Sequence, residues 1–151
     1  MTIELSWDPG RLQFDRIHAA LATSYWSPRI RRDLVERAAA NSLTLGAYRT
    51  TTGEQVAYAR VVTDRATFAY LCDVIVFEGS RGEGIGKLLV ESVLAHPELQ
   101  TVRRHALATR DAQGLYAQYG YEPVPQGNWM QRKGDPSAWQ DLNESDGDRP
   151  M

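Results

Sequence analysis

Residues 67–90 read TFAYLCDVIVFEGSRGEGIGKLLV, and this stretch decides the fold. Its first part, residues 67–77, is an almost unbroken apolar run, which predicts a strand covered on both faces. Glycines then occupy every second position of 82–86, and Ile85, Leu88, Leu89 and Val93 follow with the spacing of a helix. The order strand, glycine-rich turn, helix therefore places bare main chain at the start of a helix.

A helix N-terminus offers unpaired N–H groups and a partial positive charge, so it is a ready site for phosphate. Glycine has no Cβ and lets a ligand approach the backbone closely. Arg81 and Lys87 add positive charge at either end of the turn. These features indicate a phosphate cradle, although glycines before a helix also occur in tight turns that bind nothing.

Two common phosphate-binding loops do not match this turn. The dinucleotide fingerprint requires glycine where Lys87 stands, and an acid about 20 residues later, where the chain has Arg103 and Arg104. The nucleoside-triphosphate loop requires glycine in place of Arg81 and a hydroxyl residue in place of Leu88. The pattern that remains is R-x-x-G-x-G, from Arg81 to Gly86.

Alternating and apolar segments elsewhere predict a mixed α/β fold with helices on both faces of a mostly antiparallel sheet. The expected order is β-α-α-β-β-β-α-β-α-β-β, with about six or seven strands. Strands are expected at 2–7, 43–48, 55–62, 67–77, 101–109, 121–124 and 128–133. Helices are expected to start at Asp8-Pro9, at Ser27-Pro28, after Gly84 and at Asp111.

Two segments together, LCDVIVFEGSRGEGIGKLL at 71–89 and DAQGLYAQYGY at 111–121, resemble the GCN5-related N-acetyltransferase (GNAT) family. The resemblance covers roughly residues 43–124, and the expected element order agrees with it. It implies a sheet whose central strand parts from its neighbour beside the glycine loop. It also implies acetyl-CoA as co-substrate, lying between the two, and no metal.

The resemblance assigns a cofactor role to three groups of residues. Loop amides would hold the pyrophosphate, and the end of the long strand would pair with the pantetheine arm. A threonine hydroxyl, at a position where the family often has an asparagine, would contact the cofactor. The residues are Arg81, Gly82, Glu83, Gly84, Ile85, Gly86 and Lys87, then Val74, Ile75 and Val76, then Thr109.

The resemblance also assigns the catalytic residues Tyr116 and Asp73. Tyr116 would protonate the departing thiolate, whereas its helical spacing alone favours a core residue. Asp73 would contact the acceptor amine. As a lone carboxylate in an apolar run it needs a partner, so a structural arginine or loop amide is the alternative. Some family members have a glutamate where Cys72 stands, which leaves the general base open.

Aromatic residues are expected around the acceptor. Tyr25 and Trp26 lie in the break between the first two helices, and Tyr70 lies on the long strand three residues before Asp73. Packing in the core is the alternative role for the first two. Aromatic side chains and one acid favour a small amine as acceptor.

Composition narrows the remaining possibilities. The chain has 151 residues and one cysteine, which predicts a single domain, here 1–133, without disulfides and suited to the cytoplasm. Residues 134–151 contain five acids and one arginine and are expected to form a loosely ordered acidic tail, so 1–133 carry about +2. This charge and the absence of a long apolar run favour neither nucleic acid nor membrane as partner.

The expected function is therefore acetyl-CoA-dependent N-acetylation of a primary amine by direct attack, with Tyr116 as general acid. Two alternatives stay open at this point. One is a non-catalytic module that binds or senses acyl-CoA, and the other is an acetyltransferase for protein N-termini or lysines. The chain is expected to be a monomer or a homodimer.

Overall fold

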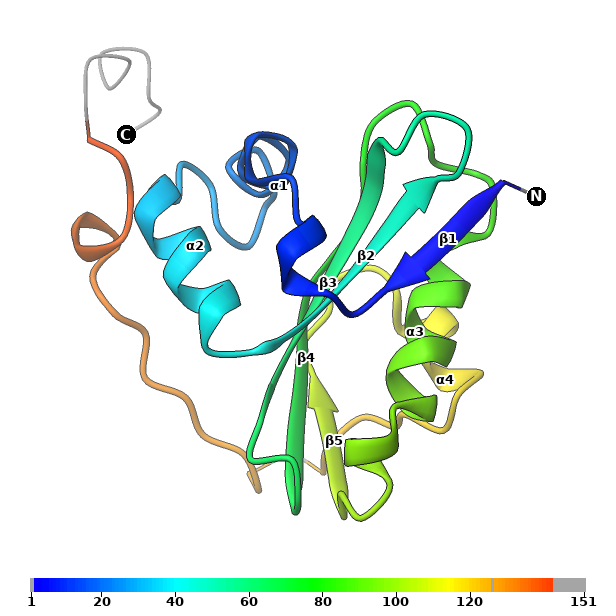
Figure 1. The fold of residues 1–151 in the computed structure, drawn as a ribbon. Helices are drawn as coiled ribbons and strands as arrows, with labels where there is room; N and C mark the ends of the chain where they lie inside the picture. The colour runs from blue at the N-terminus through cyan, green and yellow to red at the C-terminus, as the bar shows by residue number, and fades with distance from the viewer. Residues whose placement is uncertain (1, 126, 143–151) are drawn as a thin grey trace.

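The structure, a computed structural model, describes residues 2–125 and 127–142 (Figure 1). The strands are β1 Ile3–Ser6, β2 Leu43–Arg49, β3 Gln55–Thr63, β4 Phe68–Val76 and β5 Arg104–Leu107. The α-helices are α1 Phe14–Leu21, α2 Arg32–Ala40, α3 Ile85–Ala95 and α4 Gln113–Ala117. Short 3-10 helices lie at η1 Pro9–Arg11, η2 Pro97–Leu99 and η3 Pro136–Ala138.

The five strands form one sheet in the order β1-β2-β3-β4-β5. The first four pair antiparallel, while β5 pairs parallel with β4 after the crossover through α3. In Figure 1, α1 and α2 lie on one face of the sheet, and α3 and α4 lie on the other. The mixed α/β class and the helices on both faces are confirmed.

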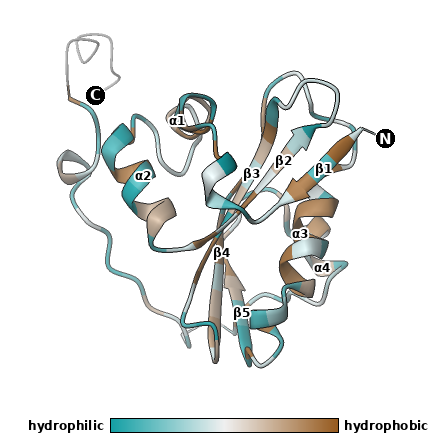
Figure 2. Cartoon of the chain, in the orientation of Figure 1, coloured by the Kyte–Doolittle hydropathy of each residue, from teal (hydrophilic) through white to brown (hydrophobic). Residues whose placement is uncertain are grey.

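Each face of the sheet has its own apolar core. On one side, Leu89, Val90 and Val93 of α3 pack with Leu45 of β2 and Val61 of β3. Figure 2 shows α3 as largely hydrophobic, in keeping with its buried face. On the other side, a smaller cluster joins buried residues of α1, α2 and the sheet: Ile17, Leu21, Val35, Tyr58 and Phe77. The long strand is thus covered on both faces, which explains its nearly continuous apolar sequence.

The strands β4 and β5 separate halfway along β4. Their pairing runs from Phe68 opposite Arg104 to Leu71 opposite Leu107, where β5 ends. Beyond Leu71, β4 continues to Val76 paired with β3 alone. The main chain of 72–76 therefore presents an open edge on the side of the sheet where β5 has ended.

A bulge interrupts β4 at the same place. Arg60 of β3 lies opposite Cys72 and Tyr58 lies opposite Ile75, so two β4 residues oppose the single residue between them. The first of the two, Asp73, has φ of 54°, a left-handed conformation that aspartate tolerates better than most residues. A bulge of this kind redirects the side chain that it carries.

Two of the expected strands are wrong. The described residues of 121–133 form no strand, so the sheet has five strands rather than six or seven. Pro123 and Pro125 lack the N–H groups that a regular ladder requires. The ring of Trp129 stacks instead on Phe68, with ring centroids 6.4 Å apart.

The expected helix starts need smaller corrections. Asp8 does cap, but it caps η1, where its side chain accepts from the Gly10 amide at 2.8 Å, and α1 starts only at Phe14. Residues 27–30 form a turn, so α2 starts at Arg32 rather than at Ser27-Pro28. At α4, Thr109 rather than Asp111 accepts the Ala112 amide, at 3.1 Å.

The described part of the expected tail contacts the loop between α1 and α2. Ile30 and Gln140 form an isolated antiparallel bridge, and the Arg31 amide donates to the Trp139 carbonyl at 3.0 Å. The Gln140 side chain adds a hydrogen bond of 3.1 Å to the Pro28 carbonyl. The C-terminal segment 138–141 is thereby joined to 28–31, and residues 143–151 lie outside the described residues.

Candidate active site

The glycine turn presents main-chain donors at the start of α3. Gly82 and Gly84 have φ of 85° and 79°, conformations that only glycine adopts without strain, and Gly84 is the N-cap residue. Its neighbour Ile85 is 1% exposed and anchors the turn in the core. Within 2–125 and 127–142, no side chain caps α3, and no main-chain acceptor takes the amides of 85–87. These amides are the unpaired donors that an anion would use.

The space over these amides is open. Gly86 lies inside the first turn of α3, and a Cβ built there would meet no described atom outside its own neighbours and helix backbone within 4 Å. Lys87 is exposed beside it. Donors, positive charge and free space together could accommodate the diphosphate of a coenzyme.

Two charged side chains fix the turn. The Arg81 side chain donates from Nε to the Val76 carbonyl at 3.0 Å, which ties the turn to the end of β4. Glu83, an acid in the middle of the turn, forms an ion pair of 2.8 Å with Arg49 at the end of β2. The sequence does not predict either contact, because neither pair of partners is adjacent in the chain.

The open edge of β4 lies directly before this turn. Val74 and Val76 pack against the core on the α3 side, and Ile75 packs against the core on the α1 and α2 side. Their side chains are thus occupied, while the main chain faces the gap left by β5. The Phe77 amide donates to the Val56 carbonyl of β3, so the main chain of Ile75, two residues earlier, also faces β3. The Val76 carbonyl is already an acceptor for Arg81, so Val74 and the Val76 amide offer the main-chain groups that remain for an extended ligand.

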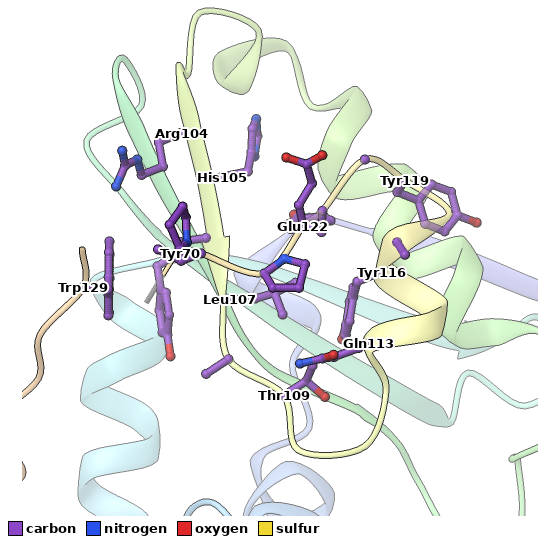
Figure 3. A pocket seen from close by; sticks show the side chains of 18 of the residues that line it. Tyr70, Arg104, His105, Leu107, Thr109, Gln113, Tyr116, Tyr119, Glu122 and Trp129 are labelled. Carbon is purple, nitrogen blue, oxygen red and sulfur yellow. The ribbon is translucent and has the colours of Figure 1, made fainter. Parts of the chain in front are cut away.

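Tyr116 lies on α4 beside a cavity of about 1440 Å³ along β5. The residue is 8% exposed, and its ring packs edge-on against Tyr121 at 5.7 Å. Figure 3 shows its ring directed toward Thr109 and Gln113 at one end of the cavity. Burial raises the pKa of Tyr116, and the nearby Tyr25 and Asp111 raise it further, so the phenol keeps its proton. A protonated hydroxyl on a cavity wall is what a general acid requires.

Asp73 is not a lone carboxylate. Its Oδ2 accepts from Arg60 Nε at 2.8 Å, and its Oδ1 accepts from the Trp26 indole at 3.1 Å. Burial lowers the pKa of Arg60, but the charge and hydrogen bond of Asp73, with smaller effects of Cys72 and Tyr58, together outweigh burial and the net pKa is raised. The Arg60 guanidinium therefore stays charged, and the structural alternative considered for Asp73 describes its contacts in this structure.

Trp26, which contacts Asp73, and its neighbour Tyr25 are exposed by 39% and 42%. Their rings meet edge-on at 5.0 Å. The Tyr25 hydroxyl accepts the Arg110 amide at 3.0 Å, and the Arg110 guanidinium lies 3.8 Å from the Tyr25 ring centre. The loop after α1 is thus joined to the loop after β5, across the opening between β4 and β5.

Tyr70 lines a different surface from Tyr25 and Trp26. It lines the cavity together with Trp129, and Figure 3 shows the two rings side by side. Burial raises the pKa of Tyr70, with smaller effects of Cys72 and Asp73, so it lies within electrostatic reach of the bulge. Among the described residues, no group of histidine, cysteine or acidic side chains could hold a metal ion.

The family model of the acetyltransferase (GNAT) domain matches residues 40–123. The chain belongs to the GNAT acetyltransferase family. Its matched region contains the parted strand, the glycine turn and Tyr116. GNAT enzymes use acetyl-CoA and act on amines, and this chain is accordingly an N-acetyltransferase.

Individual relatives agree with the GNAT assignment. A Gibberella zeae protein named "Putative acetyltransferase FG08082" is 31% identical in an alignment of 134 positions that covers 74% of this chain and 74% of that one. A crystal structure of a GNAT-family protein from Xanthomonas campestris pv. campestris is 43% identical, with a TM-score of 0.83 over 89% of this chain and 94% of that one. A GNAT acetyltransferase from Elizabethkingia anophelis with acetyl-CoA bound shares the fold, at 13% identity and a TM-score of 0.63 over 82% and 78% of the chains.

Sequence reasoning missed three arginines of this candidate site. Arg60, Arg49 and Arg110 each contact a residue that the sequence did single out: Asp73, Glu83 or Tyr25. A lone arginine on a strand or loop carries no local signal of its partner. The only indication was Asp73 itself: a buried carboxylate needs a partner, but the sequence does not show which residue supplies it. In the described residues, no helix has the length and apolarity to cross a bilayer.

Proposed function

We propose that this acetyltransferase moves the acetyl group of acetyl-CoA to a primary amine of a small molecule. One observation carries the proposal: the open edge of β4 at 72–76 leads directly to the unpaired amides of α3. An extended thiol arm pairs with a free strand edge, and its diphosphate binds a helix N-terminus. When bound, acetyl-CoA supplies the thioester whose acetyl group is transferred.

Different residues bind the diphosphate and the thiol arm of acetyl-CoA. The amides of 82–87 and the charges of Arg81 and Lys87 hold the diphosphate. The main chain of Val74, together with the Val76 amide, positions the thiol arm, and these amides polarise a carbonyl placed against them. Thr109, whose hydroxyl already accepts the Ala112 amide, orders the turn before α4 and lines the cavity beside Tyr116.

Tyr116 is the general acid in this proposal. Its raised pKa keeps the proton on Oη until the departing group needs it. Asp73, held by Arg60, fixes the Trp26 indole at the acceptor side and retains lone pairs for an amine N–H. Direct attack by the amine needs no acyl-enzyme, and burial raises the pKa of the Cys72 thiol to about 12, which leaves it a poor nucleophile.

The size of the acceptor is limited by the contact between Tyr25 and Arg110. This contact crosses the opening above the parted strands and narrows the approach from the side of α1 and α2. A compact amine passes such an opening more readily than a folded protein does. Tyr25, Trp26 and Tyr70 supply aromatic surface for the body of the acceptor.

The test is thiol release from acetyl-CoA with a panel of small amines and of peptides with free N-termini or lysines. Tyr116→Phe should lower kcat about 10- to 1,000-fold, while calorimetry shows unchanged coenzyme A binding. The matched control is Tyr119→Phe, on the same helix, which loses only a hydrogen bond to Glu91.

Each outcome has one meaning. If Tyr116→Phe has the same kcat as the unmodified protein, Tyr116 is not the general acid. Faster reaction with the peptides than with any small amine overturns the small-molecule acceptor. Absence of both thiol release and coenzyme A binding overturns the function itself.

A further inference from the structure

The glycine turn contains an acid where an anion is expected to bind. Glu83 lies between Gly82 and Gly84, immediately before the free amides of α3. A carboxylate at this position opposes a diphosphate by charge repulsion, and the proposed function gives it no task. The contacts of Glu83 show how the turn compensates for it.

Arg49 reaches Glu83 from the last position of β2. Its two terminal nitrogens donate to the two carboxylate oxygens at 3.0 and 2.8 Å, which is the bidentate geometry of a strong charge-assisted pair. The same guanidinium donates to the Ser80 hydroxyl at 3.1 Å. The Arg49 side chain, from the end of β2, therefore binds two residues of the turn, Glu83 and Ser80.

The pair is set apart from an ordinary surface contact. The two side chains are 25% and 35% exposed, so solvent screens them only in part. The other acid near Arg49, Glu54, is engaged by Arg16 at 3.1 Å. The hydrogen bond from Arg49 lowers the pKa of Glu83, so the carboxylate is charged, and Arg49 provides the balancing charge.

We infer that Arg49 is a positioning residue for coenzyme A: its bidentate pair with Glu83 neutralises the acid in the turn and makes the α3 amides competent to bind a diphosphate. The inference rests on the proposed function. Arg49 acts through Glu83 and Ser80 rather than by touching the ligand, so its loss affects binding and leaves the chemistry at Tyr116 unchanged.

The experiment compares Arg49→Met, Glu83→Gln and the double variant with the unmodified protein, using calorimetry with coenzyme A. Arg49→Met should weaken binding about tenfold, because Glu83 then faces the diphosphate uncompensated. Glu83→Gln should bind at least as well as the unmodified protein. The double variant should recover most of the lost affinity, since the charge that Arg49 neutralises is gone. In thiol release, Arg49→Met should raise the KM for acetyl-CoA with little change in kcat.

Salt separates charge compensation from a purely structural role. Because salt screens partly exposed charges, the defect of Arg49→Met should shrink to about threefold at 0.5 M NaCl. Arg65→Met, which breaks the exposed pair with Glu98, is the control and should bind normally. Unchanged affinity in Arg49→Met, or a double variant as weak as Arg49→Met, would overturn the inference. If the unmodified protein bound no coenzyme A, the proposed function would fail instead.

Discussion

Arg60 and Asp73 form an ion pair of 2.8 Å between Nε and Oδ2, at the bulge where β4 leaves β5. The two side chains are 18% and 14% exposed. The strand end that parts from its neighbour is thus fixed from the other side by a largely buried pair. The opening in the sheet is held in place by charge as well as by packing.

Asp73→Asn should destabilise the protein by about 2–4 kcal/mol, because it leaves the Arg60 charge without its partner. Asparagine retains an oxygen for the Trp26 indole and tolerates the positive φ, so the loss reports the charge rather than the bulge. The measurement is the free energy of unfolding from urea denaturation. The exposed pair offers the control: Glu98→Gln should cost less than about 1 kcal/mol. Similar costs for the two variants would show that the Asp73 pair is no more than a surface contact.

Tyr25→Phe should loosen the loop after β5 without disturbing the core. The variant removes the acceptor of the Arg110 amide, a hydrogen bond worth about 1 kcal/mol, which is roughly a fivefold change in an equilibrium constant. Hydrogen exchange at the Arg110 amide should therefore become about fivefold faster. Tyr119→Phe should leave that amide unaffected. An unchanged rate in Tyr25→Phe would mean that the two loops are not joined through this hydroxyl.

Cys72 should resist alkylation at neutral pH. Burial raises the pKa of its thiol to about 12, although Arg60 partly offsets that effect, and only the thiolate reacts. Labelling by iodoacetamide at pH 8 should be at least about 100-fold slower than in the urea-unfolded chain. The rate should rise about tenfold per pH unit, because the thiolate fraction does so until pH reaches the raised pKa. A rate that levels off near pH 9 would contradict the burial of this thiol.

Gly86→Ala should separate stability from ligand binding. The residue has no positive φ and its Cβ has free space, so alanine should stabilise α3 by about 0.5 kcal/mol. The same methyl group would occupy the space in front of the free amides and weaken coenzyme A binding about tenfold or more. The readouts are thermal unfolding and calorimetry, with Ser92→Ala on the same helix as control. Normal binding by Gly86→Ala would place the diphosphate elsewhere.

The sequence predicted the part of the fold that local rules determine. The apolar run before the glycines and the glycines themselves limit what 67–90 can form, and β4, the turn and α3 appear in that order. The N-capping aspartate at position 8 was also correctly recognised, yet the helix that it caps has three residues rather than a longer α-helix. Capping rules locate a helix start but do not set its length.

What the sequence could not supply depends on partners distant in the chain. Residues 121–124 alternate like a strand, but a strand exists only where another strand accepts its hydrogen bonds, and here none does among the described residues. The bulge at Asp73 likewise follows from the register between β3 and β4. Arg60 was unpredictable for the same reason, because it lies on another strand and pairs through the fold.

The bridge between Ile30 and Gln140 has a practical meaning for anyone handling this enzyme. The segment on which it lies, 28–31, begins two residues after Trp26, so a truncation before Trp139 should disturb the acceptor entrance that we propose at Tyr25 and Trp26. Rates measured on proteins with different C-terminal ends should therefore be compared only after that end has been matched.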